Sequence, residues 1–483
     1  MTQQVSRPQA NGVTSPQTRR SAIGLALILA VQLMLILDMT VVNVALPKIR
    51  TDLDFSASSL SWVLNAYTLT FGGLLLLGGR IGDVFGRRRT FMSGLAVFTL
   101  GSFLGGVAPT SELLVAARSL QGIGAAVAAP SVLALLTTSA KTASARNRAL
   151  ALFSAVSSAG GSLGLILGGA LTGYASWRFA LFINVPIGLF VLLFVRRYVT
   201  ETERQPGHFD ITGAVTATLG SASLVFGFIN APDHGWSSIG TVGAFIAAAV
   251  LLTGFFVTER RVPAPLLSLN LLKDRMRGGA VAVMALFVGA QFAFFFFTVQ
   301  FMQAILGYGA LKSGFAFLPL TLLIFTTSRV TPRLVGRFGV RPLIMTGLVL
   351  VAIANLWLGQ LDTSSTYLGD LLGPMILTGI GAGLGFMPLT VAVLSDVEPE
   401  HAGSASGLLQ MAQQMGGALG LAVLVTVYAS QTVPGHVVTG MSASFHTAAA
   451  FVTVGFVLAG LLLGRRGAPV EAPAESLNVE LAA

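Results

Sequence analysis

The chain contains no cysteine and very little charge. Without cysteine, neither a disulfide framework nor a thiolate metal site is possible, although this absence says nothing about the compartment. Asp, Glu, Lys and Arg make up 10% of the 483 residues, whereas a soluble domain carries about 25%. So few charges could not solvate the surface of about three ordinary domains. The composition therefore excludes a water-soluble multidomain enzyme.

Histidine is scarce as well. The five histidines fall in or near connections between apolar stretches, and no two have a metal-binding spacing on one predicted helix. They are His208, His234, His401, His436 and His446. We therefore expect no metal and no other cofactor.

Long apolar stretches occupy most of the chain. The apolar fraction is 54% and the mean hydropathy is +0.79, and a membrane-spanning helix needs roughly 17–25 mainly apolar residues. Fourteen stretches qualify, which predicts an all-α polytopic membrane protein with fourteen transmembrane helices. They are 22–46, 60–79, 90–108, 112–137, 147–172, 178–198, 210–230, 238–258, 277–303, 312–330, 340–360, 366–394, 403–430 and 444–464. The first is too long for the core of a signal peptide, so we interpret it as a retained helix.

The basic residues are distributed unevenly along this topology. With the N-terminus inside, all but five of the 29 lysines and arginines fall in cytoplasmic segments. The five exceptions are Lys48, Arg50, Arg118, Arg178 and Lys312. This bias predicts that both termini are cytoplasmic. It also explains the net charge of +10 without any nucleic acid, and it favours contact with anionic membrane lipids.

Two pairs of similar segments indicate an internal repeat. Residues 80–88 (RIGDVFGRR) match 333–341 (RLVGRFGVR) at an offset of 253, and 160–165 (GGSLGL) match 416–421 (GGALGL) at an offset of 256. Two matches in the same order predict two halves of equivalent topology, as in transporters built from parallel repeats. We therefore expect two pseudo-symmetric six-helix bundles with two inserted helices between them. The predicted divisions are a tail at 1–21, a bundle at 22–198, a linker with the inserted helices at 199–276, a bundle at 277–464 and a tail at 465–483.

Asp38 is the only one of the nineteen acidic residues that lies well inside a predicted span. A carboxylate there costs about 2.5–3.5 kcal/mol on insertion scales, so its default interpretation is functional. At 1.5 Å per residue, Asp38 lies about 12 Å and Arg118 about 9 Å from the outer ends of their helices. We expect the two to face a common cavity, where a change in their contact takes up and releases a proton while the arginine stays charged. A static ion pair, or an aspartate that snorkels to the interface, remains the alternative.

A basic loop and a row of glycines are further candidates. Glycines allow a tight turn at the second cytoplasmic loop, its arginines hold it in the cytoplasm, and Asp83 could cap or neutralise a nearby helix N-terminus. The loop candidates are Gly79, Asp83, Gly86, Arg87 and Arg88. Small residues at four-residue intervals on the fifth predicted helix suit close packing of membrane helices. These are Gly160, Gly164 and Gly168, with Gly169 following.

Polar residues within apolar spans, with Phe or Met nearby, could line a cavity of mixed polarity. Each one singly could equally be an interhelical hydrogen bond. The candidates are Asn43, Gln121, Gln291, Phe295, Gln410 and Gln414.

Four segments resemble a known family. Residues 79–88 (GRIGDVFGRR) resemble the loop signature of the major facilitator superfamily, and 37–47 (LDMTVVNVALP) resemble the first-helix motif of its fourteen-helix drug:proton antiporter branch. Residues 118–124 (RSLQGIG) and 182–188 (FINVPIG) are similar to its fourth- and sixth-helix motifs. One departure is Leu165 after Gly164, where the branch's fifth-helix antiporter motif usually has proline.

The resemblance implies a monomeric transporter of the bacterial cytoplasmic membrane that needs no cofactor and is driven by the proton gradient. It would export amphipathic small molecules, such as antibiotics, by alternating access, with Asp38 and Arg118 in proton coupling and Asp83, Arg87 and Arg88 in a gating loop. Export of an endogenous metabolite or lipid, or proton-linked import of a small solute, remains open. An intramembrane enzyme is disfavoured, because one buried aspartate without a buried histidine supplies no catalytic constellation.

Overall fold

A computed structural model describes residues 16–56, 58–138, 143–202, 204, 210–262, 269–395, 397, 402–432 and 437–463. The predicted C-terminal tail at 465–483 lies outside the described residues, as does the predicted N-terminal tail up to residue 15.

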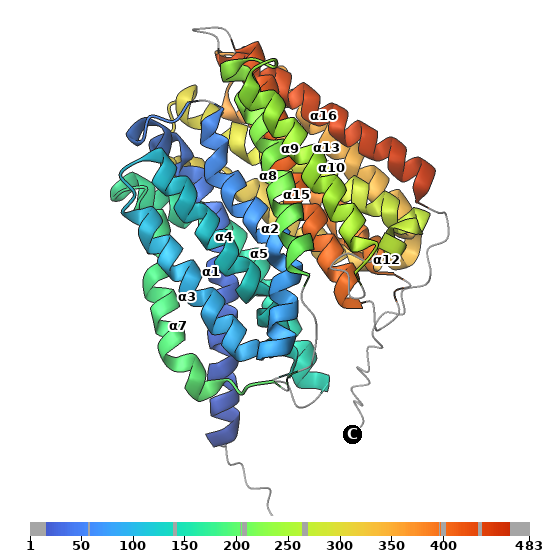
Figure 1. Cartoon of the computed structure of the whole chain (residues 1–483). Helices are drawn as coiled ribbons and strands as arrows, with labels where there is room; N and C mark the ends of the chain where they lie inside the picture. The colour runs from blue at the N-terminus through green and yellow to red at the C-terminus, as the bar shows by residue number, and fades with distance from the viewer. Residues whose placement is uncertain are drawn as a thin grey trace, which may run out of the picture.

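The described parts of the chain are helical and contain no strand (Figure 1). The first part forms α1 (Pro16–Asp52), η1 (Ser59–Ser61), α2 (Trp62–Phe85), α3 (Arg87–Gly106), α4 (Ser111–Thr138), α5 (Ala143–Tyr174), α6 (Phe179–Phe182) and α7 (Asn184–Tyr198). Two helices follow, α8 (Ile211–His234) and α9 (Ile239–Glu259). The remainder forms η2 (Leu269–Lys273), α10 (Arg275–Ala304), α11 (Ala310–Ala316), α12 (Leu318–Phe338), α13 (Val340–Leu358), η3 (Tyr367–Leu371), α14 (Leu372–Leu394), α15 (Ala402–Gln431) and α16 (Val437–Leu462).

Twelve helical segments in the described residues are long and apolar enough to cross a membrane. The predicted spans at 90–108 and 147–172 are also helical, as α3 and α5, but they are not among these twelve. α3 begins with three arginines, which lowers its hydropathy. The all-helical membrane class is therefore confirmed, with twelve helical segments in the described residues that are long and apolar enough to cross a membrane.

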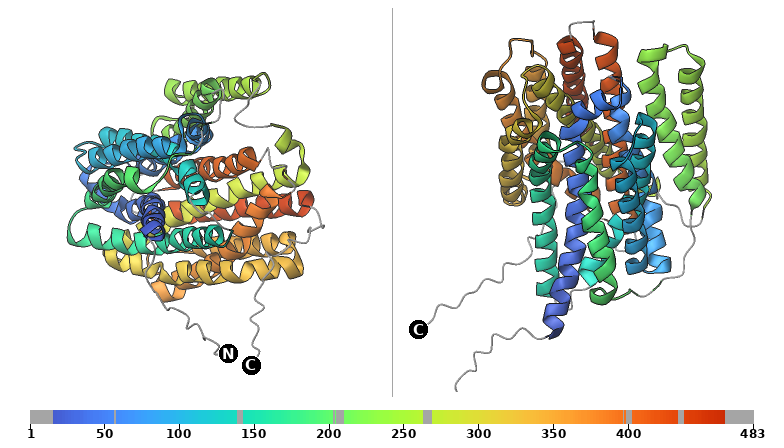
Figure 2. Two further views of the ribbon diagram at one scale, coloured as in Figure 1. Left: turned by 90° about the horizontal axis from the view of Figure 1, so that it is seen from below. Right: turned by 90° about the vertical axis from the view of Figure 1, so that its left-hand side faces the viewer.

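The helices pack in two groups along the chain. In the first part α1 packs on α5, α2 on α4, and α3 on α4 and α7; in the last part α10 packs on α15 and α16, and α14 on α12 and α13. The first part meets the last where α2 contacts α15 and where α5 contacts α11. Figure 2 shows these helices running roughly parallel in one bundle.

The pair α8 and α9 lies on the outside of the bundle (Figures 1 and 2). α8 packs against both α2 and α15, whereas α9 packs mainly on α8. A small apolar cluster joins α8 to α2 and α15 through Leu69 of α2, Val225 and Ile229 of α8, and Ala418 of α15. At the far end of α8, Asp233 accepts hydrogen bonds from Ser58 and Ser56, just before α2.

Two turn glycines support the internal repeat. Gly86 joins α2 to α3 with φ +100°, and Gly339 joins α12 to α13 with φ +79°. Such backbone is unfavourable for a residue with a Cβ atom. The two glycines are separated by 253 residues, which is the offset of the matched loop segments.

Candidate functional site

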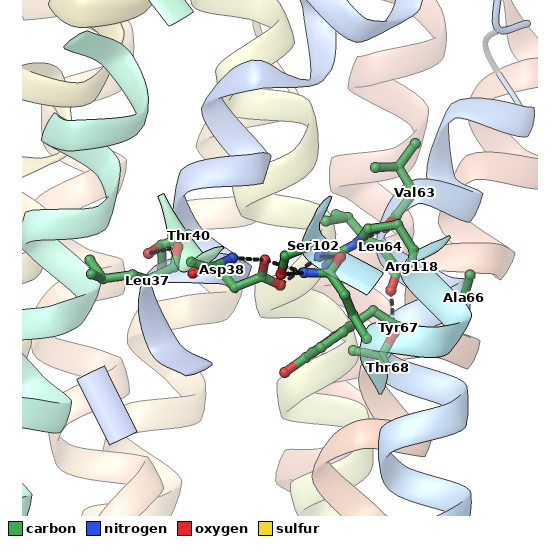
Figure 3. Close-up of polar contacts among 12 residues, drawn as sticks. Leu37, Asp38, Thr40, Val63, Leu64, Ala66, Tyr67, Thr68, Ser102 and Arg118 are labelled. Carbon is green, nitrogen blue, oxygen red and sulfur yellow. Dashed lines mark hydrogen bonds and ion pairs between the residues drawn. The ribbon is translucent and has the colours of Figure 1, made fainter. Parts of the chain in front are cut away.

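A buried ion pair joins α1 to α4. Nη1 of Arg118 donates to Oδ2 of Asp38 at 2.5 Å, and the two side chains are 1% and 0% exposed. In Figure 3 the carboxylate of Asp38 points from α1 directly at the guanidinium of Arg118. The structure therefore brings together the two residues that the depth argument paired.

The Asp38 carboxylate is held by neutral donors as well. Its Oδ1 accepts from Nε2 of Gln121 at 2.9 Å and from Nδ2 of Asn184 at 2.8 Å. Nε2 of Gln121 also donates to Oγ of Ser102 at 2.7 Å, and all of these side chains are buried. Helices α1, α4 and α7 thus meet at one carboxylate, and α3 joins the network through Ser102.

Arg118 makes further contacts that fix its orientation. Its Nε donates to the carbonyl oxygen of Val63 at 2.9 Å, and its Nη1 donates to Oε1 of Gln121 at 2.9 Å. Its guanidinium carbon lies 4.6 Å from the centroid of the Tyr67 ring. The ring and the carboxylate both favour a fixed positive charge at this point.

Glycines let the backbones carrying this network approach closely. A Cβ on Gly101 of α3 would lie 2.8 Å from the Gln121 backbone nitrogen, and one on Gly122 of α4 would collide with Thr70 and with the carbonyl of Tyr67 on α2. Thr70 also donates to the carbonyl oxygen of Ser119 at 3.0 Å. Close backbone contact of this kind holds the polar side chains in one geometry.

Chemically, the arrangement is an acidic side chain that accepts hydrogen bonds from an arginine and two amides within an apolar core. Burying two charges is costly unless both are paired and hydrogen-bonded, and removal of either partner leaves the other uncompensated. Loss of either charge would therefore weaken the contact between α1 and α4.

A cavity of about 790 Å³ lies beside this pair. One wall is apolar and aromatic and comes from α1, α2, α4 and α5, while α15 contributes polar side chains. The apolar wall includes Leu35, Met39, Tyr67, Phe71, Leu75, Leu133 and Phe153, and the polar wall includes Ser406, Gln410, Gln413 and Gln414. The cavity extends to Arg80 and Asp83 at the end of α2, to Arg87 at the start of α3 and to Asp210 at the start of α8.

The six predicted cavity residues are in different places. Gln410 and Gln414 line the cavity, and Gln121 belongs to the Asp38 network instead. The other three are not among the described residues that line it. Oδ1 of Asn43 and Oε1 of Gln291 are buried without a hydrogen-bond partner in the described residues, and the ring of Phe295 packs at 5.4 Å from that of Phe317.

Asp83 is expected from the sequence to cap or neutralise a nearby helix N-terminus. Its carboxylate pairs at 2.5 Å with Arg87, the first residue of α3, across the Gly86 turn and makes no capping hydrogen bond to the α3 backbone as the structure describes it. The N-terminus of α3 is capped from the segment after α7, where Glu201 accepts from the backbone N–H of Arg88 at 2.8 Å and of Arg89 at 3.2 Å. No local sequence pattern indicates Glu201, which is more than a hundred residues from the α3 N-terminus.

The remaining loop residues surround that contact. Nη1 of Arg88 donates to the carbonyl oxygen of Val199 at 3.1 Å, and a Cβ on Gly86 would meet the Glu201 carboxylate. Gly79 faces Pro130 of α4, 3.7 Å from where its Cβ would be. The loop thus connects the ends of α2, α3 and α7.

The predicted glycine row packs α5 against its neighbours. A Cβ on Gly160 would lie 3.1 Å from Leu33 and Ile36 of α1, one on Gly164 would overlap Thr40, and one on Gly168 would lie 2.7 Å from the carbonyl oxygen of Val41. Gly169 faces the opposite way, against Ala310 and Leu311 of α11. The row therefore lies next to the α1 segment that carries Asp38.

No cluster of three or more potential metal ligands occurs in the parts of the chain that the structure describes.

Comparison with solved structures finds the same fold in distant transporters. A peptide transporter of the POT family in an auto-inhibited state superimposes with a TM-score of 0.67, at 16% identity, over 94% of this chain and 99% of that chain. At this identity the likeness shows the fold alone.

Comparison of sequences finds nearer relatives. The chain is 41% identical to the cephamycin export protein CmcT of Amycolatopsis lactamdurans over 87% of this chain and 88% of the relative. It is also 41% identical to the puromycin resistance protein pur8 of Streptomyces alboniger, over 85% and 82%. The family model described as Major Facilitator Superfamily matches residues 28–421 and 333–478. The chain therefore belongs to the major facilitator superfamily, a family of membrane transporters and not of enzymes.

Proposed function

We propose that the protein exports amphipathic small molecules, such as antibiotics, in exchange for protons. The observation that carries this proposal is the fully buried Asp38–Arg118 pair beside a cavity of about 790 Å³. Intramembrane ionisable groups are expensive and usually serve transport or proton transfer. The names of the two relatives, a cephamycin exporter and a puromycin resistance protein, support the direction and the substrate class.

The same proposal includes fourteen membrane-spanning helices in two six-helix bundles. α3 has 20 residues and α5 has 32, and about 20 residues suffice to span a bilayer. Both pack among helices that qualify as spans, α3 on α4 and α5 on α1. The bundles would comprise 22–198 and 277–464, with α8 and α9 inserted between them and both termini in the cytoplasm of a bacterium.

The cavity favours amphipathic substrates that are neutral, zwitterionic or monocationic. Its aromatic wall suits an apolar ring, and the glutamines of α15 offer hydrogen bonds in both directions. At its wide end Asp83 and Arg87 neutralise each other. One deep carboxylate could not balance a dication and also carry a proton.

In the exchange cycle, Asp38 binds a proton when the outer side is open, and its contact with Arg118 weakens. The helices then repack so that the cavity opens to the cytoplasm, where the proton leaves and the ion pair re-forms. The formed ion pair and the cavity that reaches the basic loop support this second state as part of the proposal. Substrate enters this cavity and is carried outward as the cycle returns. The monomer suffices, because the pair and the cavity lie within one chain.

The test is proton movement driven by substrate in proteoliposomes that contain the purified protein and a pH-sensitive dye. Puromycin, a cephamycin and a panel of lipophilic dyes would be added under an imposed pH gradient. We expect protons to move opposite to the substrate in the wild type, and Asp38→Asn to abolish this movement. Asp362→Asn, an acid-to-amide change in the exposed turn between α13 and η3, is the matched control and should behave like the wild type.

Co-movement of substrate and proton in the same direction would instead identify a proton-linked importer. Failure of the whole antibiotic and dye panel, with movement of a metabolite or lipid, would identify an exporter of an endogenous compound. Full proton-coupled transport by Asp38→Asn would reject the role of this carboxylate.

A further inference from the structure

Tyr67 belongs both to the ion-pair site and to the cavity. Its ring lies under the Arg118 guanidinium, 4.6 Å from ring centroid to guanidinium carbon, and the same side chain lines the cavity wall. Asp38, Arg118, Gln121 and Asn184 are not among the described residues that line the cavity. Tyr67 is therefore at the boundary between the two.

Its position on α2 places it at the deep end of the cavity. The α2 residues that line the cavity include Tyr67, Phe71, Leu75, Gly79 and Asp83, which recur every fourth residue on one helix face. The series ends at the basic loop on one side and at Tyr67 on the other. In Figure 3 the Tyr67 ring crosses below the pair, from α2 toward α1.

Neighbouring rings hold Tyr67 in this position. It packs edge-on to Phe98, with centroids 6.5 Å apart at 81°, and at 5.7 Å from Phe71. The residue is 1% exposed. A ring packed in this way excludes water from the space behind it.

The hydroxyl group of Tyr67 does not contribute to this packing. It is buried and has no hydrogen-bond partner in the described part of the chain. Buried polar groups are rarely left unpaired, and each exception needs an explanation, such as a functional role or contact with water. A phenylalanine would fill the same space at a lower cost, so contact of the hydroxyl with water from the neighbouring cavity would explain its presence.

We propose that the Tyr67 ring is the seal between cavity water and the Asp38–Arg118 pair, and that its displacement admits the water through which Asp38 exchanges its proton. The role of this seal in proton exchange rests on the proposed proton-coupled function. Whether the ring keeps water away from the ion pair can be tested without measuring transport.

The test uses the absence of cysteine from the chain, so that one introduced thiol is the only labelling site. Ser102→Cys places it within the Asp38 network, next to Gln121, at a fully buried position. The purified protein would be treated with a small neutral methanethiosulfonate reagent, and labelling would be followed by mass spectrometry. Ser406→Cys, on the cavity wall, is the accessible control.

We expect Ser102→Cys to label slowly, and Tyr67→Ala to increase its rate by at least about tenfold, because the buried site no longer needs local opening to meet water. Tyr67→Phe, which keeps the ring, and Phe71→Ala, one turn away, should leave the rate low. Ser406→Cys should label equally in all backgrounds. If Tyr67→Ala does not fold, Tyr67→Leu serves in its place, with the same expected increase.

An unchanged rate in Tyr67→Ala or Tyr67→Leu would overturn the proposal, as would an equal increase in Phe71→Ala, because that would show general loosening. In proteoliposomes, Tyr67→Ala should also leak protons without substrate, and Asp38→Asn added to it should stop the leak. If the wild type shows no substrate-linked proton movement, the proposed function fails while the labelling result still decides whether Tyr67 is a seal.

Discussion

At the residue scale, the candidate site depends on two charged side chains, Asp38 and Arg118, that are buried in an apolar interior. Asp38 and Arg118 could be paired from depth alone, because few charged residues lie deep in the apolar spans. The sequence does not identify Asn184 and Ser102 as members of the hydrogen-bond network around Asp38. Amides and hydroxyls are common in membrane helices, and their meaning depends on the helix face they share.

Tyr67 and Glu201 were missed for different reasons. The four-residue spacing from Tyr67 to Asp83 on one face of α2 was available as a signal, since it aligns an aromatic ring with the loop motif. Glu201 reaches the N-terminus of α3 from a distant part of the chain. Local pattern cannot predict such a contact.

The contacts of Arg118 predict that its geometry matters as well as its charge. Arg118→Lys keeps the charge but loses the separate bonds to Val63, Asp38 and Gln121, because an ammonium has no fixed fork of donors. One lost charged hydrogen bond is worth about 1.5–3 kcal/mol, so proton-coupled transport should fall by about tenfold or more.

The matched control is Arg178→Lys. Arg178 donates to the carbonyl oxygen of Ala108 at 2.7 Å and lies over the ring of Trp177, but it is outside the Asp38 network. Initial rates in the proteoliposome assay should separate the two variants. Equal rates would show that only the charge of Arg118 is used.

At the scale of the elements, the sequence predicts where helices occur better than it predicts the residues at which they begin and end. All fourteen predicted stretches are helical where described, since runs of apolar residues must satisfy their backbone groups internally. The stretch at 178–198 is divided into α6 and α7, and that at 312–330 into α11 and α12, with Pro319 near the start of α12. Hydropathy averages over such breaks and does not detect them.

The contact between α1 and α5 predicts a clear difference between two glycines of α5. A Cβ on Gly168 would lie 2.7 Å from a backbone oxygen of α1, whereas one on Gly161 meets nothing within 4 Å. Gly168→Ala must therefore push the helices apart and should destabilise the protein by about 1–3 kcal/mol. Gly161→Ala should be neutral or stabilising by up to about 1 kcal/mol, because alanine is the better helix former.

Thermal unfolding followed by tryptophan fluorescence would measure both variants. Nε1 of the buried Trp177 donates to Asp52 at the end of α1, so its emission reports on this region. A Gly168→Ala protein as stable as Gly161→Ala would contradict the close contact.

At the scale of the whole molecule, the two halves of the chain are in contact at the end opposite the basic loop. Nε2 of Gln303 in α10 donates to the carbonyl oxygen of Val44 in α1 at 3.0 Å. In the same region, Gly314 of α11 packs against the carbonyl oxygen of Leu165 in α5. The proposed alternating access requires these contacts to open once per cycle. Repeats in the sequence predicted the halves but not which end is closed.

A disulfide across this closed end should stop transport. The Cβ position of Gly173 lies 3.9 Å from the backbone nitrogen of Leu311, which suits the Cα separation of about 4.4–6.8 Å that a disulfide spans. We expect Gly173→Cys combined with Leu311→Cys to lose transport on oxidation and to regain it with a reductant. Each single variant should be unaffected, and a cross-linked protein that still transports would contradict the opening.

The presence of a single carboxylate at the centre of the ion-pair site also limits how much work one cycle can do. One carboxylate exchanges one proton, and a membrane potential of 100 mV supplies about 2.3 kcal/mol per charge. A pH difference of one unit adds about 1.4 kcal/mol, so each unit supports roughly a tenfold concentration ratio of a neutral substrate. The pseudo-symmetric position in the second half, at the offset of 253, is Gln291, an amide that cannot carry a second proton. Under the proposed proton coupling, the energy available for export is therefore that of one proton per molecule.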